Sequence, residues 1–329
     1  MTIAARTGVA LAAALLLVGS ISAASPSSRP TSAPSVIRFE LRDNLVRIPV
    51  DVNGQRQSGV LDSGAGAVLL DRQVSRQLGL SEGAAAGDAA GGGNEAKALL
   101  PITISRLSAG PLQFENLAAY AMDLGNLSSS AGFPVDVILG APAFEKGIVS
   151  VDYARRHVTI DRSKATPFCA APIPLEIVHA APVIEIEVRP MKGERPVHLK
   201  VLVDLGTRHS ALVLGGAFLR SEVGKRLLET AVAKEVGFGV GGAVNGAAAR
   251  VADVRAGRSN FGPLEVSLTS NVPAFEGTGI DGTLGVPLWI GGVIAFDYEG
   301  RRLCITRQKA ASRAPSKDVV MQHRAAPRP

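Results

Sequence analysis

The sequence has few of the residues on which several common enzyme chemistries depend. It contains only two cysteines and five histidines, and they are not clustered with the spacing of a metal site. No His-Glu-x-x-His pattern occurs, so a helix-borne zinc site has no support. Aromatic residues make up only 4%, beside 36 glycines and many Val, Leu and Ala residues. That balance favours a β-rich globular protein over a disordered or fibrous chain.

The main part of the chain also lacks a strongly basic region. The net charge is +6, but the basic excess lies in residues 1–36 and 307–329, and the chain between them is close to neutral. We therefore expect no nucleic-acid partner. Residues 308–329 are predicted to form a basic flexible tail.

The only long apolar run stands near the beginning. Arg6 precedes apolar residues 9–21, and small residues follow at 22–24. This pattern predicts a signal peptide over 1–24, a flexible leader over 25–36, and an exported, periplasmic or secreted protein with no stable membrane insertion after cleavage. An uncleaved anchor is the alternative, although the run is short for a membrane span.

An internal repeat is the most informative feature. Residues 136–153 align without a gap on residues 281–298. Upstream of each copy, Val-Leu-Asp62-Ser-Gly-Ala matches Leu-Val-Asp204-Leu-Gly-Thr, and Gly-Pro-Leu recurs between each such pair, beginning at Gly110 and Gly262. The chain is therefore predicted to be a tandem duplication. Its expected parts are a first lobe at 37–165, a linker at 166–171 and a second lobe at 172–307.

Each copy is expected to consist mainly of strands. Alternating apolar and polar residues at 45–52 and 183–188 predict half-buried strands, and Asn53-Gly54 predicts a hairpin turn. Residues 71–78 predict a short helix capped by Asp71, and residues 218–233 a longer one.

Two glycine-rich segments, 87–93 and 237–246, predict mobile hairpins. The second contains a Gly-x-Gly-x-x-Gly pattern, but no strand-then-helix context surrounds it, so a flap is preferred to a dinucleotide site.

Asp62 and Asp204 are the candidates for chemistry. Each follows apolar strand residues and precedes a turn, although an ionised Asp is costly to bury unless it is paired or neutralised. A pseudo-twofold axis can bring both to the lobe boundary, where adjoining carboxyl groups share one proton. One then acts as general base toward a water while its protonated partner polarises a carbonyl. The alternative is that each Asp only caps its own turn.

The turn Asp62-Ser63-Gly64 resembles the active-site turn of retropepsin-like and pepsin-like aspartic proteases. The segments Ile138-Leu139-Gly140 and Leu284-Gly285 resemble the apolar-Gly motif that supports this turn. The similarity spans nearly all of residues 37–307. It implies a mainly β fold with short helices, in which two homologous β-barrel-like lobes are related by a pseudo-twofold axis. It also implies an aspartic endopeptidase that acts on peptides or proteins, needs no cofactor or metal, and completes its site as a monomer.

One position departs from the family pattern. The family places a hydroxyl after each catalytic Asp to form a hydrogen-bonded grip, and this chain has Ser63 in one lobe but Leu205 in the other. In the turn Leu205-Gly206-Thr207, the threonine is expected to offer its hydroxyl to Asp204. The alternative function is therefore a catalytically weak or inactive peptide-binding module with the same fold.

Other repeated residues are expected to be structural, and the cysteines are left open. Turns and strand ends are the expected role of Asp136, Asp152, Asp281 and Asp297, and backbone requirements that of Gly140 and Gly285. Cys169 and Cys304 either form a bridge from the linker to the last strand or remain two separate thiols.

Overall fold

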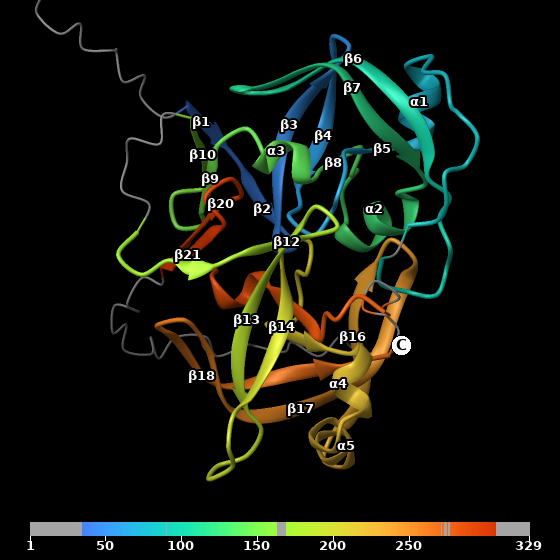
Figure 1. Ribbon diagram of the computed structural model, residues 1–329. Coiled ribbons are helices and arrows are strands. Elements are labelled where there is room, and N and C mark those ends of the chain that lie inside the picture. The colour runs from blue at the N-terminus through green and yellow to red at the C-terminus, as the bar shows by residue number, and fades with distance from the viewer. Residues whose placement is uncertain are drawn as a thin grey trace, which may run out of the picture. The chain divides into compact units, whose positions relative to one another are not determined.

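The computed structural model describes residues 35–89, 91–162, 169–270, 272, 275 and 277–306. The predicted signal peptide and tail, most of the predicted leader and half of the predicted linker lie outside these residues. The chain is mainly β, as the sequence predicts, and Figure 1 shows a first lobe coloured blue to green and a second coloured yellow to orange. No described helix is long and apolar enough to cross a membrane.

The first lobe is built on a seven-stranded sheet that closes on itself. Strand β3 pairs with β4 through the predicted turn, where Asn53 and Gly54 have φ of 51° and 86°. The far end of β3 pairs with β6, which closes the barrel. The spatial order is β2 (Glu40–Arg42), β3 (Leu45–Val52), β4 (Gln55–Leu61), β8 (Val137–Leu139), β5 (Leu69–Asp71), β7 (Leu112–Met122) and β6 (Leu100–Ala109).

The second lobe repeats this order and adds one strand. The closure of β3 on β6 recurs as the pairing of β13 with β17. The additional strand β16 forms a hairpin with the long β17 and has no counterpart among the described strands of the first lobe. The order is β12 (Glu176–Val178), β13 (Ala181–Arg189), β14 (Val197–Asp204), β19 (Gly282–Gly285), β15 (Leu212–Leu214), β18 (Ser259–Leu268), β17 (Gly242–Ala256) and β16 (Val232–Gly239).

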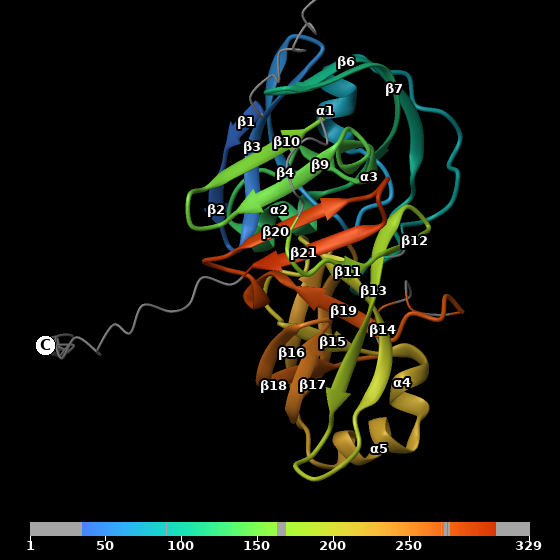
Figure 2. The same ribbon diagram turned by 60° about the vertical axis from the view of Figure 1, so that its left-hand side comes forward.

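A third sheet joins the two lobes around the pseudo-twofold axis. Its order is β1 (Ser35–Arg38), β10 (His157–Asp161), β9 (Ile148–Asp152), β20 (Val293–Asp297), β21 (Arg302–Thr306) and β11 (Ile173–Pro174). In Figure 2 the green β9 and β10 lie beside the red β20 and β21. Ser150 pairs with Ala295, its own equivalent in the repeat alignment. The axis therefore passes through this pair of residues.

Aromatic side chains of each copy contact aromatic side chains of the other copy across the same axis. Phe144 of the first copy stacks on Tyr298 of the second, with ring centroids 5.4 Å apart. Trp289, the equivalent of Phe144, donates a hydrogen bond of 3.3 Å to the hydroxyl of Tyr153, the equivalent of Tyr298. All four side chains are buried. Each lobe thus completes the core of the other.

The helices are short, and one prediction about them is wrong. α1 (Arg72–Gln77) is capped by Asp71, as expected, and α2 (Gly125–Ala131) and α3 (Ala141–Phe144) follow in the first lobe. The helix predicted over 218–233 is instead two, α4 (Gly216–Arg220) and α5 (Glu222–Glu229), before β16 begins. Ser221 separates them because its side chain accepts the amide hydrogen of Gly224 as a new N-cap. A single 3₁₀ turn, η2 (Val286–Leu288), follows β19.

The matched Gly-Pro-Leu motifs do not occupy equivalent places. Gly110 forms the β6–β7 turn with φ of 57°, whereas Gly262 lies inside β18. The structural equivalent of Gly110 is Gly257, with φ of 55° in the β17–β18 turn. A side chain at Gly110 would press on Ile37 and one at Gly257 on Ile173. The third sheet therefore packs on equivalent turns of the two lobes.

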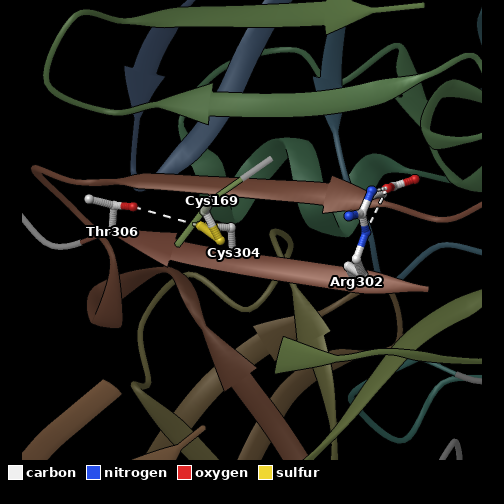
Figure 3. Close-up of a disulfide and its surroundings, with 5 residues drawn as sticks. Cys169, Arg302, Cys304 and Thr306 are labelled. Atoms are coloured by element: carbon white, nitrogen blue, oxygen red, sulfur yellow. Dashed lines mark hydrogen bonds and ion pairs between the residues drawn. A yellow bond between two sulfur atoms is a disulfide. The ribbon is translucent and has the colours of Figure 1, made fainter. Parts of the chain in front are cut away.

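Cys169 and Cys304 form a disulfide, which decides between the two alternatives left by the sequence. Their Cα atoms are 6.3 Å apart. Figure 3 shows Cys304 on β21 with Cys169 lying against it. The bridge joins residues separated by 135 positions, and so ties the start of the second lobe to its last strand.

Candidate active site

Two equivalent strand pairs carry Asp62 and Asp204 to the lobe boundary. β4 runs parallel to β8 and ends at Leu61, and the Asp62 amide then donates to the Leu139 carbonyl at 3.0 Å. β14 runs parallel to β19 in the same way, with Asp204 opposite Gly285. The apolar strand residues before each Asp are largely buried, which fixes where each strand ends.

The repeated aspartates outside the turns have structural roles, as predicted. The Asp136 carboxylate accepts the Ser58 amide at 2.8 Å, and Asp281 accepts the Lys200 amide at 3.0 Å, which joins the starts of the paired strands. Asp152 and Asp297 accept amide hydrogens within the turns after β9 and β20.

The supporting glycines are required by space, as predicted. A Cβ atom at Gly140 would collide with the Ala65 carbonyl, and one at Gly285 with the Ser210 and Thr207 carbonyls. The residue after each glycine donates its amide to the turn, Ala141 to Ala65 at 2.8 Å and Val286 to Thr207 at 2.9 Å. Ile138, Leu139 and Leu284 are buried beside these glycines, and Ile138 also lines the cavity described below.

The two Asp turns meet face to face. A Cβ atom added at Gly64 would lie 2.6 Å from the Asp204 carboxyl group, and one at Gly206 would lie 2.6 Å from Asp62. The two carboxyl groups also interact, because the charge of Asp204 and a hydrogen bond with it raise the pKa of Asp62. Each turn therefore needs glycine because the opposite carboxyl group occupies the space of a side chain.

Backbone and side-chain donors orient the two carboxyl groups. The Gly64 amide donates to Asp62 at 2.8 Å, and the Gly206 amide donates to Asp204 at 2.6 Å. Thr207 donates its hydroxyl to the other oxygen of Asp204 at 2.8 Å, as predicted. Asp204 thus has a side-chain donor that Asp62 lacks.

Half of the hydroxyl grip is present. The buried Ser63 hydroxyl donates to the Val203 carbonyl at 2.7 Å and accepts the Leu205 amide at 3.1 Å, so it joins the first lobe to the second. Leu205 is fully buried in the hydrophobic core and returns no such bond.

The environment of the pair favours a neutral Asp62. Burial raises the pKa of Asp62 well above its usual range, and the adjoining Asp204 charge and hydrogen bond raise it further. The amides of Gly64 and Ala65 oppose this shift by stabilising the carboxylate. Two carboxyl groups at this separation hold one proton between them over a wide pH range.

A mostly apolar cavity of about 450 Å³ opens over the pair. Both lobes contribute to its walls. First-lobe lining includes Val60, Leu69, Tyr120, Met122 and Ile138, and second-lobe lining includes Leu202, Val213, Phe238 and Phe275. Among the described residues, no three His, Cys, Asp or Glu side chains gather as a metal site.

Two glycine-rich segments cover the cavity. Residues 237–246 form the tip of the β16–β17 hairpin, as predicted. The first segment, residues 87–93, also turns back on its own lobe, as predicted: Leu99 donates to the Gly87 carbonyl at 2.9 Å, Ala89 donates to the Lys97 carbonyl at 2.8 Å, and Asp88 and Ala98 form an antiparallel bridge. The described residues of its tip bond in addition to the other lobe. Gly241 donates to the Gly92 carbonyl at 2.9 Å, and Glu95 donates to the Gly241 carbonyl at 3.0 Å. Figure 1 shows the orange hairpin reaching toward α2 of the first lobe.

Sequence reasoning missed a charged cluster beside the turn of Asp204. His209 is partly exposed, and its ring pairs with Asp43 of the first lobe at 3.1 Å. Arg208 pairs with the same carboxylate and is buried. The sequence signal for this cluster is the position of Arg208 directly after the Asp204 turn, because its partner Asp43 is distant in sequence.

Comparison with known proteins agrees with this geometry. Residues 48–143 match the family model described as aspartyl protease. No curated protein gives a significant match. The crystal structure of an aspartic proteinase from Irpex lacteus is similar at 11% identity, with 82% of this chain and 96% of that chain covered and a TM-score of 0.49. The first lobe is therefore similar to the aspartyl protease family, and the same Asp turn recurs in the second lobe of this bilobal fold.

Proposed function

We propose that the protein is an aspartic endopeptidase in which Asp62 and Asp204 activate a water molecule. The meeting of the two carboxyl groups beneath a cavity is the observation that supports this proposal. The ionised carboxylate takes a proton from the water as the oxygen attacks the peptide carbonyl, and the protonated partner hydrogen-bonds to the carbonyl oxygen. A proton then passes from the pair to the leaving amine as the C–N bond breaks.

The cavity favours peptides with apolar side chains next to the cleaved bond. Apart from the two aspartates, the titratable side chains among its lining residues are Tyr120, Arg208 and His209. An extended peptide would displace water from apolar walls on both sides of the pair. We also propose that the protein is exported, since its disulfide fits an oxidising compartment.

The test is cleavage of a peptide library by the purified protein between pH 3 and 7, read by mass spectrometry. We expect cleavage at acidic pH, inhibition by a statine-containing peptide, and a loss in kcat of about 10³-fold in Asp62→Asn and in Asp204→Asn. Glu115→Gln, the same change at an exposed site on β7, is the control and should cleave normally. Unchanged cleavage by Asp62→Asn would contradict the proposal.

A peptide-binding module without turnover is the second candidate, and Leu205 is the observation that favours it. The buried leucine removes one of the two grip hydroxyls. This function predicts peptide affinity that neither Asp→Asn substitution changes, together with no cleavage products. Affinity by calorimetry and products by mass spectrometry separate the two functions.

A further inference from the structure

The side chain of Arg208 crosses the lobe boundary directly after the turn of Asp204. It is only 2% exposed. Nη1 donates to Asp43 Oδ2 at 2.5 Å and Nη2 donates to Ser130 Oγ at 2.6 Å, both in the first lobe. The Asn44 side-chain amide donates to the Arg208 carbonyl at 2.8 Å. The first lobe therefore holds both the guanidinium and the backbone of this residue.

The first-lobe anchor of Arg208 lies next to the strand that ends at Asp62. Asp43 and Asn44 form the β2–β3 turn, with φ of 47° and 62°, a conformation that Asp and Asn tolerate better than most residues. β3 begins directly after them, and its Val46 pairs with Leu61, the residue before Asp62. A short path of paired strands thus connects Arg208 to Asp62.

Each Asp turn supplies a different connection to the opposite lobe. The first turn gives the Ser63 hydroxyl, and the second turn, where Leu205 has no hydroxyl, gives Arg208 instead. Gly66 stands at the position equivalent to Arg208, and a Cβ atom there would lie 3.0 Å from the His179 carbonyl of the second lobe. The first turn has no room for an equivalent arginine.

We propose that Arg208 is a positioning residue that keeps the Asp204 turn in register with Asp62, in place of the grip hydroxyl that Leu205 lacks. This proposal rests on the proposed peptidase function. Burying a guanidinium is costly unless its partners are well placed, so the contact favours one relative position of the two turns. Burial lowers the pKa of Arg208 and the charge of Asp43 opposes that shift. The cation is therefore balanced by a first-lobe carboxylate.

Two substitutions at Arg208 separate the effect of its hydrogen-bond geometry on kcat from the effect of its charge. Arg208→Met removes both donors, and we expect kcat to fall about tenfold or more with KM little changed, because misplaced reacting groups slow the chemical step. Arg208→Lys keeps the charge but cannot donate to Asp43 and Ser130 together, so its kcat should lie between that of the wild type and that of Arg208→Met. Arg72→Met, which removes a first-lobe ion pair with Glu82, is the control and should retain normal kcat.

A rescue and a titration complete the test. Leu205→Thr should restore most of the lost kcat in Arg208→Met and add little to the wild type. The carboxyl titration of Asp62, followed by ¹³C NMR, needs no turnover, and in Arg208→Met its pKa should fall toward the ordinary value as Asp204 moves away. If the wild type neither cleaves nor binds a statine-containing peptide, the peptidase proposal fails, but this titration still decides the role of Arg208.

Normal kcat, or unchanged Asp62 titration, in folded Arg208→Met would overturn the proposal. If that variant does not fold, Ser130→Ala removes one arm of the contact and leaves the ion pair. It should show the same changes on a smaller scale, and wild-type values for both kcat and titration would overturn the proposal.

Discussion

The surroundings of Asp62 disfavour its ionised form, because the side chain is buried and Asp204 adjoins it. Burial raises the pKa of the Tyr153 and Tyr298 hydroxyls, and the charge of Asp204 raises both further. The buried groups around the pair therefore favour neutral states, whereas the Gly64 and Ala65 amides stabilise an Asp62 carboxylate. The protein holds two acids where the ionisation of both is unfavourable.

This arrangement predicts a pH-dependent gain in stability for Asp62→Asn. Because the folded-state pKa of Asp62 is raised, its stabilising contribution is complete below the pKa of the unfolded chain and is lost as the pH rises through the folded-state value. Asparagine cannot ionise, so the variant avoids this loss. We expect its Tm to exceed that of the wild type by about 2 °C or more at pH 7, with a smaller difference at pH 3.

Thermal unfolding from pH 3 to pH 7 measures this difference. Acidic groups that do not contact Asp62 titrate alike in both proteins and cancel in the comparison. Glu115→Gln should follow the wild type throughout. A Tm difference between Asp62→Asn and wild type that stays constant or shrinks with rising pH would show that Asp62 is not held neutral.

Elements governed by local patterns could be predicted from the sequence, and those governed by contacts with the other lobe could not. Residues 45–52 form β3 with the predicted bounds because alternation and the Asn53-Gly54 turn are local signals. The hairpin predicted at 87–93 is consistent with the antiparallel bonds of this loop to residues 97–99, whereas its bonds to Gly241 of the other lobe could not be predicted, since its glycines carry no side chains that indicate a partner. The break at Ser221 was missed because helical periodicity continues through it.

The bond between this loop and the β16–β17 tip predicts a local effect of Gly93→Ala. Gly93 has φ of 101°, and a Cβ atom there would collide with the Gly241 backbone. Two backbone hydrogen bonds of about 1 kcal/mol each should then weaken, so the amides of Glu95 and Gly241 should exchange with solvent about tenfold faster or more. Hydrogen exchange measured by NMR tests this.

Gly237→Ala is the matched control because it adds the same methyl group on the β16–β17 hairpin that the loop contacts, with no atom within 4 Å. It should leave the exchange of both amides unchanged. Equal exchange in Gly93→Ala and wild type would mean that the loop and hairpin are not held together by these bonds.

At the scale of the whole molecule, the duplication made the meeting of Asp62 and Asp204 predictable. Two copies around one axis place equivalent turns together, and the Ser150–Ala295 pair shows where that axis runs. Contacts that break the symmetry were not predictable, because nothing local in Asp43 or Arg208 indicates a partner in the other lobe. The additional strand β16 is likewise a feature of one copy alone among the described strands.

The disulfide is the covalent feature that acts at this scale. Since Cys169 and Cys304 enclose nearly the whole second lobe, the bridge restricts the unfolded chain strongly, and its loss should reduce the free energy of unfolding by about 2–4 kcal/mol. We expect a lower urea midpoint for Cys169→Ala/Cys304→Ala and for reduced wild type. Reductant should not change the double variant. If it leaves the wild-type midpoint unchanged, the bridge does not stabilise the fold, and the pairing of β21 within the third sheet holds the end of the second lobe without it.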